Sequence, residues 1–384
     1  MMKKIEEIIQ ISKGKKPKLI SKVLEKGLMP YVDIKAFEQK IIDNYTDGEK
    51  CLPCEDGDLL IVCDGSRSGL VGKAVKGYVG STLARIDIDK SVLPEYIYHF
   101  IQGKYIQLNT SIKGTGTPHL NQELLKSFEL YVPPLEDQHR IVTRIEELFS
   151  QLDSGVETLK KTKEQLKVYR QAVLNELICE GELSELRYCI DDMGQGWSPK
   201  CIRTPVLNND EWAVITTTSI QPMKFIYSEN KKLPDSLEPR MKHVIEVGDI
   251  LITRAGPRVR CGVCCMVRQT KSKLLNCDKV YRIKVNKRLI IPEYLEIVLN
   301  SPEFQKEVSF CKTGGNDSGV NLTQERFLSI KIPVPTINKQ KEKVEEAESR
   351  LSVCDSIEKT IDTALQEAEA LRQSILKQAF EGGL

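Results

Sequence analysis

The residues best suited to chemistry in this sequence are arginines that crowd one short segment. Arg254, Arg258 and Arg260 are separated by small residues and prolines or valines in Thr253–Arg260, directly after the strand-like run Ile250–Ile252. A loop of this composition presents guanidinium groups to phosphates and to the edges of guanine. The spacing therefore predicts a DNA-contacting loop, against the plainer interpretation of these charges as a solvated face.

Other segments share this basic or glycine-rich character. Asp64–Lys73 occupies the matching place in the first half of the chain. Residues 113–121 and 312–321 combine Gly, Thr and amide side chains, which suit close approach to phosphate and the reading of adenine; an ordinary surface turn is the alternative. We expect DNA contacts from these basic and amide-bearing positions: Lys15, Lys16, Arg67, Lys73, Lys113, Thr115, Arg254, Arg258, Arg260, Lys312 and Asn316.

Motifs for catalysis or cofactor binding do not accompany these loops. A phosphate-binding loop ending at Gly72-Lys73 would need Gly in place of Arg67 and Ser or Thr in place of Ala74. Gly114–Gly116 lacks the third glycine of a dinucleotide-binding loop. Pro133-Pro134 lacks the polar and aromatic neighbours found in the catalytic motif of DNA adenine methyltransferases. We therefore predict a chain without catalytic residues or a cofactor.

The twelve cysteines offer thiols without a clear metal-binding pattern. Cys51 and Cys54 form a CxxC, and four more cysteines crowd residues 261–277. Zinc requires two matched pairs or a Cys/His set, and none of the four histidines stands beside either group. We expect ordinary buried thiols and no metal.

Charge is segregated along the chain although the net charge is only +2. Residues 135–183 and 336–384 each carry ten acidic and seven basic side chains, so these two segments total −6 and the remainder is +8. Residues 249–290 hold eleven Lys and Arg against two Asp. A secretory leader and a membrane-length apolar run are not evident, so we expect a cytoplasmic protein with no membrane partner.

The elements that must position these loops occur twice. Gly57–Ile61 recurs as Gly248–Ile252, and Pro94–Tyr96 recurs as Pro292–Tyr294. The order of the matches is the same in both halves, and the offset grows from 191 residues at the first match to 202 at the last. A match of this kind at several places indicates an internal duplication whose halves differ by loop insertions.

Each half ends in a long proline-free segment with apolar residues at steps of three and four. Such a narrow stripe is typical of a helix with one partner helix, and a coiled coil is expected; two helices each packed on its own globule are the alternative. The predicted fold is α+β: two tandem α/β domains separated by two long helices, with an internal pseudo-twofold repeat. The expected boundaries are 1–134 and 184–335 for the two domains, and 135–183 and 336–384 for the helical segments.

These features together resemble the specificity subunit of type I restriction–modification systems. Pro133–Gln138 is similar to the family's junction of paired prolines, leucine, two small or acidic residues and glutamine; Pro335–Gln340 keeps the first proline and the glutamine but has Thr336 for the second proline. The helix endings and Gly194–Pro199 are also similar to the family's. Lys13–Pro17 stands in the place equivalent to Gly194–Pro199.

The resemblance implies two target-recognition domains held apart by an antiparallel coiled coil of the long helices, and with them a role and partners. Each domain would read one half of a bipartite site in double-stranded DNA, and the helices would set the gap and dock two methylation subunits, which supply the S-adenosylmethionine chemistry; restriction subunits would join that core. A helix of about 45 residues spans roughly 70 Å, or about 20 base pairs of duplex. The alternatives are a stand-alone DNA methyltransferase or nuclease and a coiled-coil scaffold with no DNA role.

Overall fold

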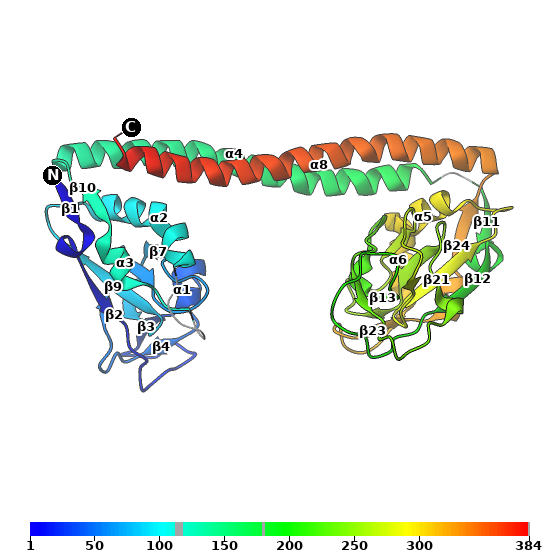
Figure 1. The fold of residues 1–384 in the computed structure, drawn as a ribbon, viewed down its shortest axis with the longest axis horizontal. Helices are drawn as coiled ribbons and strands as arrows, with labels where there is room; N and C mark the ends of the chain where they lie inside the picture. Colours follow the sequence, from blue (N-terminus) through cyan, green and yellow to red (C-terminus); the bar gives the residue numbers. More distant parts are fainter. Residues whose placement is uncertain (112–117, 179–180, 383–384) are drawn as a thin grey trace. The chain divides into compact units, whose positions relative to one another are not determined.

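The computed structural model describes residues 1–111, 118–178 and 181–382. The chain divides into two compact units, one formed by Met1–Lys160 with Asp362–Leu384 and the other by Lys161–Ile361. Two long helices, α4 (Leu135–Glu176) and α8 (Ile337–Phe380), each contribute residues to both units (Figure 1). Within the described ranges, helices with both the length and the apolar composition needed for a bilayer crossing do not occur.

Two four-stranded sheets form the first unit. One is antiparallel with the order β2-β9-β6-β7; the other has the order β4-β3-β8-β5, in which β3 and β8 are parallel. A separate antiparallel pair joins β1 to β10. The strands are β1 (Met2–Lys4), β2 (Ile9–Lys13), β3 (Met29–Val32), β4 (Tyr45–Thr46), β5 (Pro53–Cys54), β6 (Leu59–Val62), β7 (Val71–Lys73), β8 (Gly77–Val79), β9 (Leu83–Ile88) and β10 (Glu129–Tyr131). The shorter helices are η1 (Ile5–Glu7), α1 (Ile34–Gln39), α2 (Pro94–Thr110) and α3 (Gln122–Ser127).

The second unit has an antiparallel sheet of order β12-β21-β17-β19 and smaller sheets around it. These are β16-β13-β20, with β13 and β20 parallel, β18-β23-β22, β14-β15 and β11-β24. The strands are β11 (Glu182–Glu185), β12 (Ile190–Gln195), β13 (Ala213–Ile215), β14 (Ile220–Gln221), β15 (Lys224–Phe225), β16 (Asn230–Lys232), β17 (Ile250–Thr253), β18 (Ala255–Gly256), β19 (Cys264–Met266), β20 (Leu274–Leu275), β21 (Val280–Val285), β22 (Lys312–Thr313), β23 (Val320–Leu322) and β24 (Lys331–Val334). The helices are η2 (Leu186–Tyr188), η3 (Thr217–Ser219), η4 (Met241–His243), α5 (Pro292–Asn300), α6 (Pro302–Phe310) and α7 (Gln324–Leu328).

The predicted internal repeat and the α+β class are confirmed. Both four-stranded antiparallel sheets have the same order, with β6 and β17 as equivalent inner strands. The parallel pair β3-β8 of the first unit corresponds to β13-β20 of the second. Helices α2 and α5 both begin with proline, whose fixed φ suits the first helical position.

Strands β6 and β17 are apolar throughout because both of their faces are covered. Leu59 and Ile61 belong to one buried cluster and Leu60 to another on the opposite face, as successive side chains of a strand alternate. Ile250 and Leu251 divide in the same way between two clusters of the second unit. Continuous burial explains the uninterrupted apolar runs that reveal the repeat in the sequence.

The long helices run antiparallel to one another in each unit. In the second unit Arg170 donates to Asp355 at 2.6 Å and Arg350 donates to Glu176 at 2.9 Å, so one helix ascends in number as the other descends. In the first unit Arg372 pairs with Asp153. The predicted helix pair is therefore confirmed. The long helices also pack on the globules, as the alternative supposed. Their ends enter the globular cores through residues such as Val142, Val173, Leu174, Leu177 and Val344.

A buried glutamine fixes the start of each long helix on its globule. The Gln138 amide accepts from the backbone N–H of Leu93 at 2.9 Å and donates to the carbonyls of Ser91 and Pro133. Gln340 repeats this arrangement with Ile291, Leu289 and Pro335. Both glutamines are fully buried. The glutamine of the sequence motif is thus a clamp, in which one side chain satisfies three backbone groups of two segments.

The described cysteines are all free thiols, and most are buried. Burial raises the pKa of Cys54 and of Cys63 to about 11, and that of Cys277 likewise to about 11. Such thiols stay protonated at neutral pH and are poor nucleophiles. Over the part of the chain that the structure describes, groups of three or more His, Cys, Asp or Glu that could hold a metal are not found.

Candidate nucleic-acid interface

The arginine loop of the second unit is closed by backbone hydrogen bonds at the end of β17. Gly262 N donates to Thr253 O at 2.8 Å, and Thr253 N donates to Val263 O at 2.9 Å. Gly262 has a φ of +89°, and a Cβ there would lie 2.6 Å from Val308 Cγ1 of α6. Only glycine suits this position, because it combines a left-handed backbone with close contact to a helix.

The first unit builds its matching loop in the same way at the end of β6. Gly69 N donates to Val62 O at 2.8 Å, Gly69 has a φ of +94°, and a Cβ there would lie 2.7 Å from Leu108 Cβ of α2. Gly69 is therefore the structural counterpart of Gly262. The second loop is two residues longer between strand and glycine.

The structure brings the two predicted loops of the second unit together. Strand β23, which closes the 312–321 segment, pairs with β18 inside the arginine loop. Arg258 N donates to Asp317 O at 2.9 Å, and Arg258 Nε donates to Asp317 Oδ1 at 2.6 Å. Lys312 Nζ donates to Arg258 O at 3.2 Å, and Asn316 lies exposed in the same turn.

Arg258 is the most accessible of the three arginines for an external anion. The side chains of Arg258 and its partner Asp317 are 45% and 83% exposed. An exposed ion pair of this kind contributes about 0–1 kcal/mol, so a phosphate or a base edge competes with it readily. Beside it, Val259 is 84% exposed at the tip of the loop, and Phe310 is 77% exposed where α6 ends.

Arg254 and Arg260 point their guanidinium groups toward the protein. Arg254 lies 5.3 Å from the ring centre of Tyr281 and donates to Asp278 O at 3.1 Å. Its Nε is buried and has no hydrogen-bond partner among the described residues. Arg260 donates to two backbone carbonyls and to the side chain of Gln221. The sequence could not distinguish these roles because the partners lie in distant segments.

The first unit also joins its two predicted segments. Gly65 N donates to Pro118 O at 2.9 Å, and Asp64 contacts both Lys13 at 2.8 Å and His119 at 2.7 Å. Burial raises the pKa of Asp64, but the hydrogen bonds and charges of Lys13 and His119 outweigh it and hold that pKa below its usual value. Lys13 and His119 are not among the residues predicted to contact DNA, although His119 lies inside the predicted segment 113–121 and Lys13 stands two residues before Lys15.

The remaining predicted residues of the first unit that the structure describes are exposed. Lys15 and Lys16 lie in the loop after β2. Arg67 pairs with Glu38, and Lys73 pairs with Glu95 at 3.3 Å. Lys113 and Thr115 lie outside the described residues.

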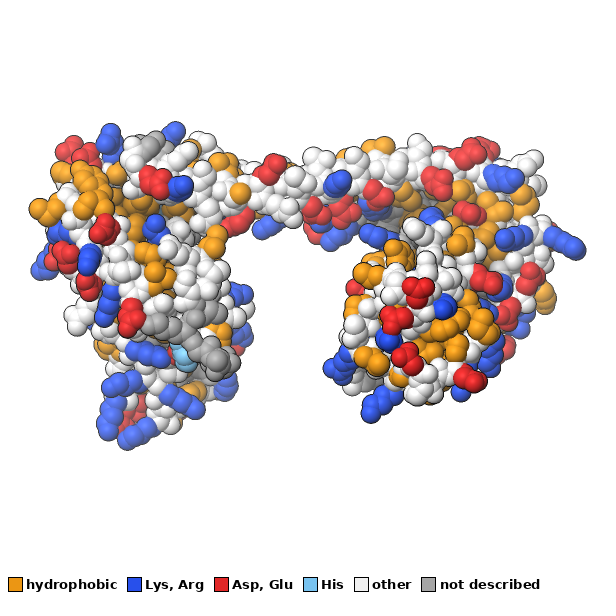
Figure 2. All heavy atoms as spheres, viewed as in Figure 1, with side chains coloured by type: hydrophobic (Ala, Val, Ile, Leu, Met, Phe, Trp, Pro, Cys, Tyr) orange, Lys and Arg blue, Asp and Glu red, His pale blue; other side chains and the backbone are white. Residues whose placement is uncertain are grey.

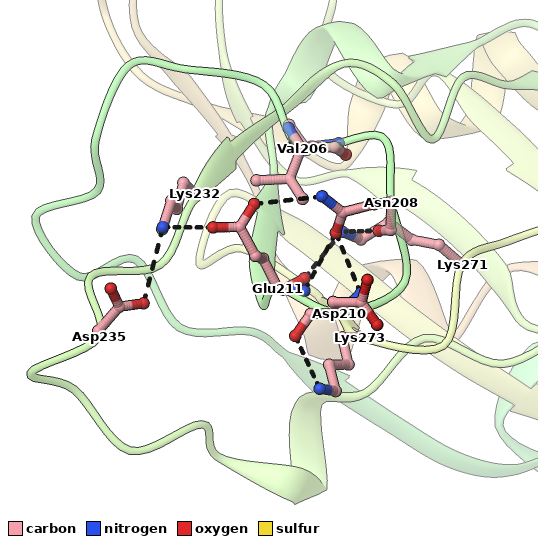
Figure 3. A network of polar contacts seen from close by, with 9 residues as sticks. Val206, Asn208, Asp210, Glu211, Lys232, Asp235, Lys271 and Lys273 are labelled. Carbon is pink, nitrogen blue, oxygen red and sulfur yellow. Dashed lines mark hydrogen bonds and ion pairs between the residues drawn. The ribbon is translucent and has the colours of Figure 1, made fainter.

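Much of the positive charge in residues 249–290 has structural partners. Lys271 is only 4% exposed and donates to Asn208 O at 3.0 Å and Glu211 O at 2.9 Å (Figure 3). Lys273 donates to Asp210 O at 2.7 Å of the same loop. Figure 2 shows Lys and Arg side chains interspersed with Asp and Glu on the visible face of each unit. These lysines of the basic run therefore stabilise a neighbouring loop by hydrogen bonds to its backbone carbonyls.

A cavity of about 570 Å³ lies at the opposite end of β17 from the arginine loop. It is lined by acidic and basic groups together, among them Glu246, Asp249, Lys284 and Arg288. Lys284 pairs with Glu246 at 2.7 Å, so the charges of this cavity largely compensate one another.

Comparisons with known proteins agree with the geometry. Residues 1–168 match the family model described as type I restriction modification DNA specificity domain. The EcoEI specificity subunit of Escherichia coli is 36% identical over 177 residues, which cover 46% of this chain and 30% of that protein. The MjaVIII specificity subunit of Methanocaldococcus jannaschii is 22% identical over 368 residues, covering 90% and 84% of the two chains.

Solved structures show the same fold. A chain from a study of complex assembly and conformational transition in the type I R-M system has a TM-score of 0.71 at 17% identity, covering 100% of this chain and 98% of that one. The HsdS subunit of Thermoanaerobacter tengcongensis has a TM-score of 0.51 at 16% identity, covering 100% and 97%. The chain is therefore similar in sequence, over its first 168 residues, to the type I restriction modification DNA specificity domain, and similar in fold to the HsdS subunit over its whole length.

Proposed function

We propose that this chain reads DNA sequence for a type I restriction–modification complex, with each globular unit reading one half of a bipartite site. The observation that carries this function is the duplicated loop. In both units a glycine-closed loop bearing arginine is anchored on a helix and lies beside a second loop. Two copies of one DNA-contacting loop would suit a DNA site with two separate halves.

The DNA contacts would come from the predicted residues that lie around these loops. Arg258, with Lys312 and Asn316 beside it, forms the centre of the surface in the second unit. Arg67, Lys73, Lys15 and Lys16 would serve the first unit, and Lys113 and Thr115 are retained on sequence grounds. Arg254 and Arg260 belong to the same loop as Arg258. Both would lie within the interface, although their guanidinium groups face the protein.

For the domain boundaries we propose the division predicted from the sequence. Residues 1–134 and 184–335 would form the two target-recognition domains, and 135–183 and 336–384 the spacer segments. Support comes from the bounds of α4 and α8, which begin at Leu135 and Ile337. At 1.5 Å per residue each helix is about 65 Å long, a length comparable to about 19 base pairs of duplex.

The partners would be double-stranded DNA, two methylation subunits docked on the helices, and restriction subunits. A relative of the same fold comes from a study of type I complex assembly. The chain itself would be non-catalytic, with S-adenosylmethionine bound by the methylation subunits. Cytoplasmic location follows from this role, because the DNA substrate and the partner subunits are found there.

The test is reconstitution with the methylation subunit of the same host. The assembled complex is expected to methylate one bipartite sequence, which methylome sequencing identifies, and to retard DNA carrying that sequence in a mobility-shift assay. The pure chain is expected to transfer no labelled methyl group. Methylation by the chain alone would establish a stand-alone methyltransferase instead, and a complex indifferent to DNA would favour the scaffold.

A further inference from the structure

Arg260 holds a segment that the sequence did not associate with DNA. Its Nη2 donates to the backbone carbonyls of Thr217 at 2.8 Å and Ile220 at 2.5 Å, and its Nη1 donates to Gln221 Oε1 at 3.1 Å. Three acceptors therefore converge on one guanidinium from some 40 residues away in the sequence. A charged, fork-shaped donor is well suited to fixing such a turn.

The braced segment is a compact hairpin. It comprises η3, β14 and β15, and Met223 in the tight turn adopts a left-handed φ of +57°. Met223 N donates to Cys264 O of β19 at 3.0 Å, which is a second anchor. Gln221 Nε2 also donates to Thr218 O at 2.9 Å. The hairpin is thus fixed to the arginine loop on one side and to the central sheet on the other.

The hairpin and the strand after it expose groups that suit base edges better than phosphates. Thr218 Oγ1 donates to Glu229 Oε2 at 2.7 Å, and both residues are exposed. A carboxylate repels phosphate but accepts from the amino group of cytosine, and a threonine hydroxyl contacts either partner of a base pair. Lys224 is exposed in the same hairpin and adds a positive charge to it.

The first unit contains a corresponding brace. Arg67 stands two residues before Gly69, as Arg260 stands two before Gly262, and Arg67 pairs with Glu38 of α1. Helix α1 follows β3, the strand parallel to β8, as η3 follows β13, the strand parallel to β20. In both units the loop arginine therefore reaches the element that follows the parallel strand.

We propose that Arg260 is a positioning residue that fixes residues 216–229 as a second base-reading segment, in which Glu229 and Thr218 recognise the amino group of a cytosine. This rests on the proposed function and extends it, since it names a base class and the residues that select it. Arg258 contacts DNA from the loop itself, whereas Arg260 acts through the hairpin.

The brace is tested first in the full-length chain without DNA. Arg260→Ala is expected to raise amide hydrogen exchange across residues 216–226 by about tenfold or more, because charge-assisted hydrogen bonds are lost. Arg258→Ala, in the same loop, is the matched control and should leave exchange there unchanged. Arg260→Lys should restore protection only in part, since an ammonium lacks the fork. Unchanged exchange in Arg260→Ala would overturn the brace whatever the chain does to DNA.

The reading role is tested in the complex with the methylation subunit. Methylome sequencing of Glu229→Gln is expected to shift one position of one half-site from cytosine toward adenine by about tenfold, because an amide pairs with adenine. Arg260→Ala should relax the same half-site and leave the other intact, which general destabilisation would not do. An unaltered half-site in Glu229→Gln, Thr218→Ala and Arg260→Ala would overturn this role. A wild-type complex without any sequence preference would instead refute the proposed function.

Discussion

At the residue scale, the arginines of one loop differ in direction, because the guanidinium group of one faces outward and those of the others face inward. Arg258→Ala removes an exposed side chain, so the free energy of unfolding should change by no more than about 0.5 kcal/mol. DNA binding should respond in one of two ways. If Arg258 contacts a phosphate, its loss should lower the salt slope of binding by about one; if it contacts a guanine, its loss should cost about 1–3 kcal/mol of discrimination between DNA sequences. Both are measured by titrating the assembled complex with specific and nonspecific DNA at several salt concentrations.

The control for Arg258→Ala is Lys331→Ala, an exposed lysine on β24, remote in the fold from the arginine loop. It should leave affinity and salt slope at the wild-type values. Full retention of affinity, discrimination and salt slope by Arg258→Ala would remove the loop from the interface.

At the scale of elements, the glutamine clamps hold each long helix on its globule. Gln340→Leu would leave one backbone N–H and two carbonyls without their partner in a buried place. Each of the three lost partners costs about 1–3 kcal/mol, so the free energy of unfolding should fall by at least about 3 kcal/mol. Denaturant titration measures this, and Gln138→Leu should behave alike. Gln171→Leu, at an exposed site of α4, is the control; equal stability of Gln340→Leu and Gln171→Leu would contradict the clamp.

At the scale of the whole molecule, the proposed spacer role makes helix length a determinant of the recognised sequence. Lys163 and Arg170 of α4 both pair with Glu358 of α8, so residues 162–165 and 357–360 belong to the same stretch of the helix pair. Deleting both segments should shorten the helix pair by roughly 6 Å and turn it by about 40°. We expect the bases of both half-sites to persist while the gap between them shrinks by nearly two base pairs at about 3.4 Å each.

Methylome sequencing reads the gap directly, and the single deletion in α4 serves as the comparison. The single deletion disturbs the register of the apolar residues between the helices, and the matched deletion restores that register. Altered half-site bases with an unchanged gap in the matched deletion would refute the spacer role.

The sequence by itself determined the duplication, the long helices and the places of the two glycine-closed loops at the ends of β6 and β17. These depend on local patterns: apolar runs for buried strands, three- and four-residue steps for α4 and α8, and glycines where the chain must turn. Gly69 and Gly262 are required by backbone geometry and by close helix contact, so they are visible as residue types.

Only the tertiary structure decided what each charged side chain does. Arg258 and Arg260 are two residues apart and chemically identical, yet one pairs with exposed Asp317 and the other with carbonyls of residues 217 and 220. In the sequence Lys271 belongs to a basic run, but in the structure it is buried beneath the loop that contains Asn208. The partners lie some 40 to 60 residues away, and hydrogen bonding over such separations is fixed by how the strands and loops pack, which no local pattern encodes.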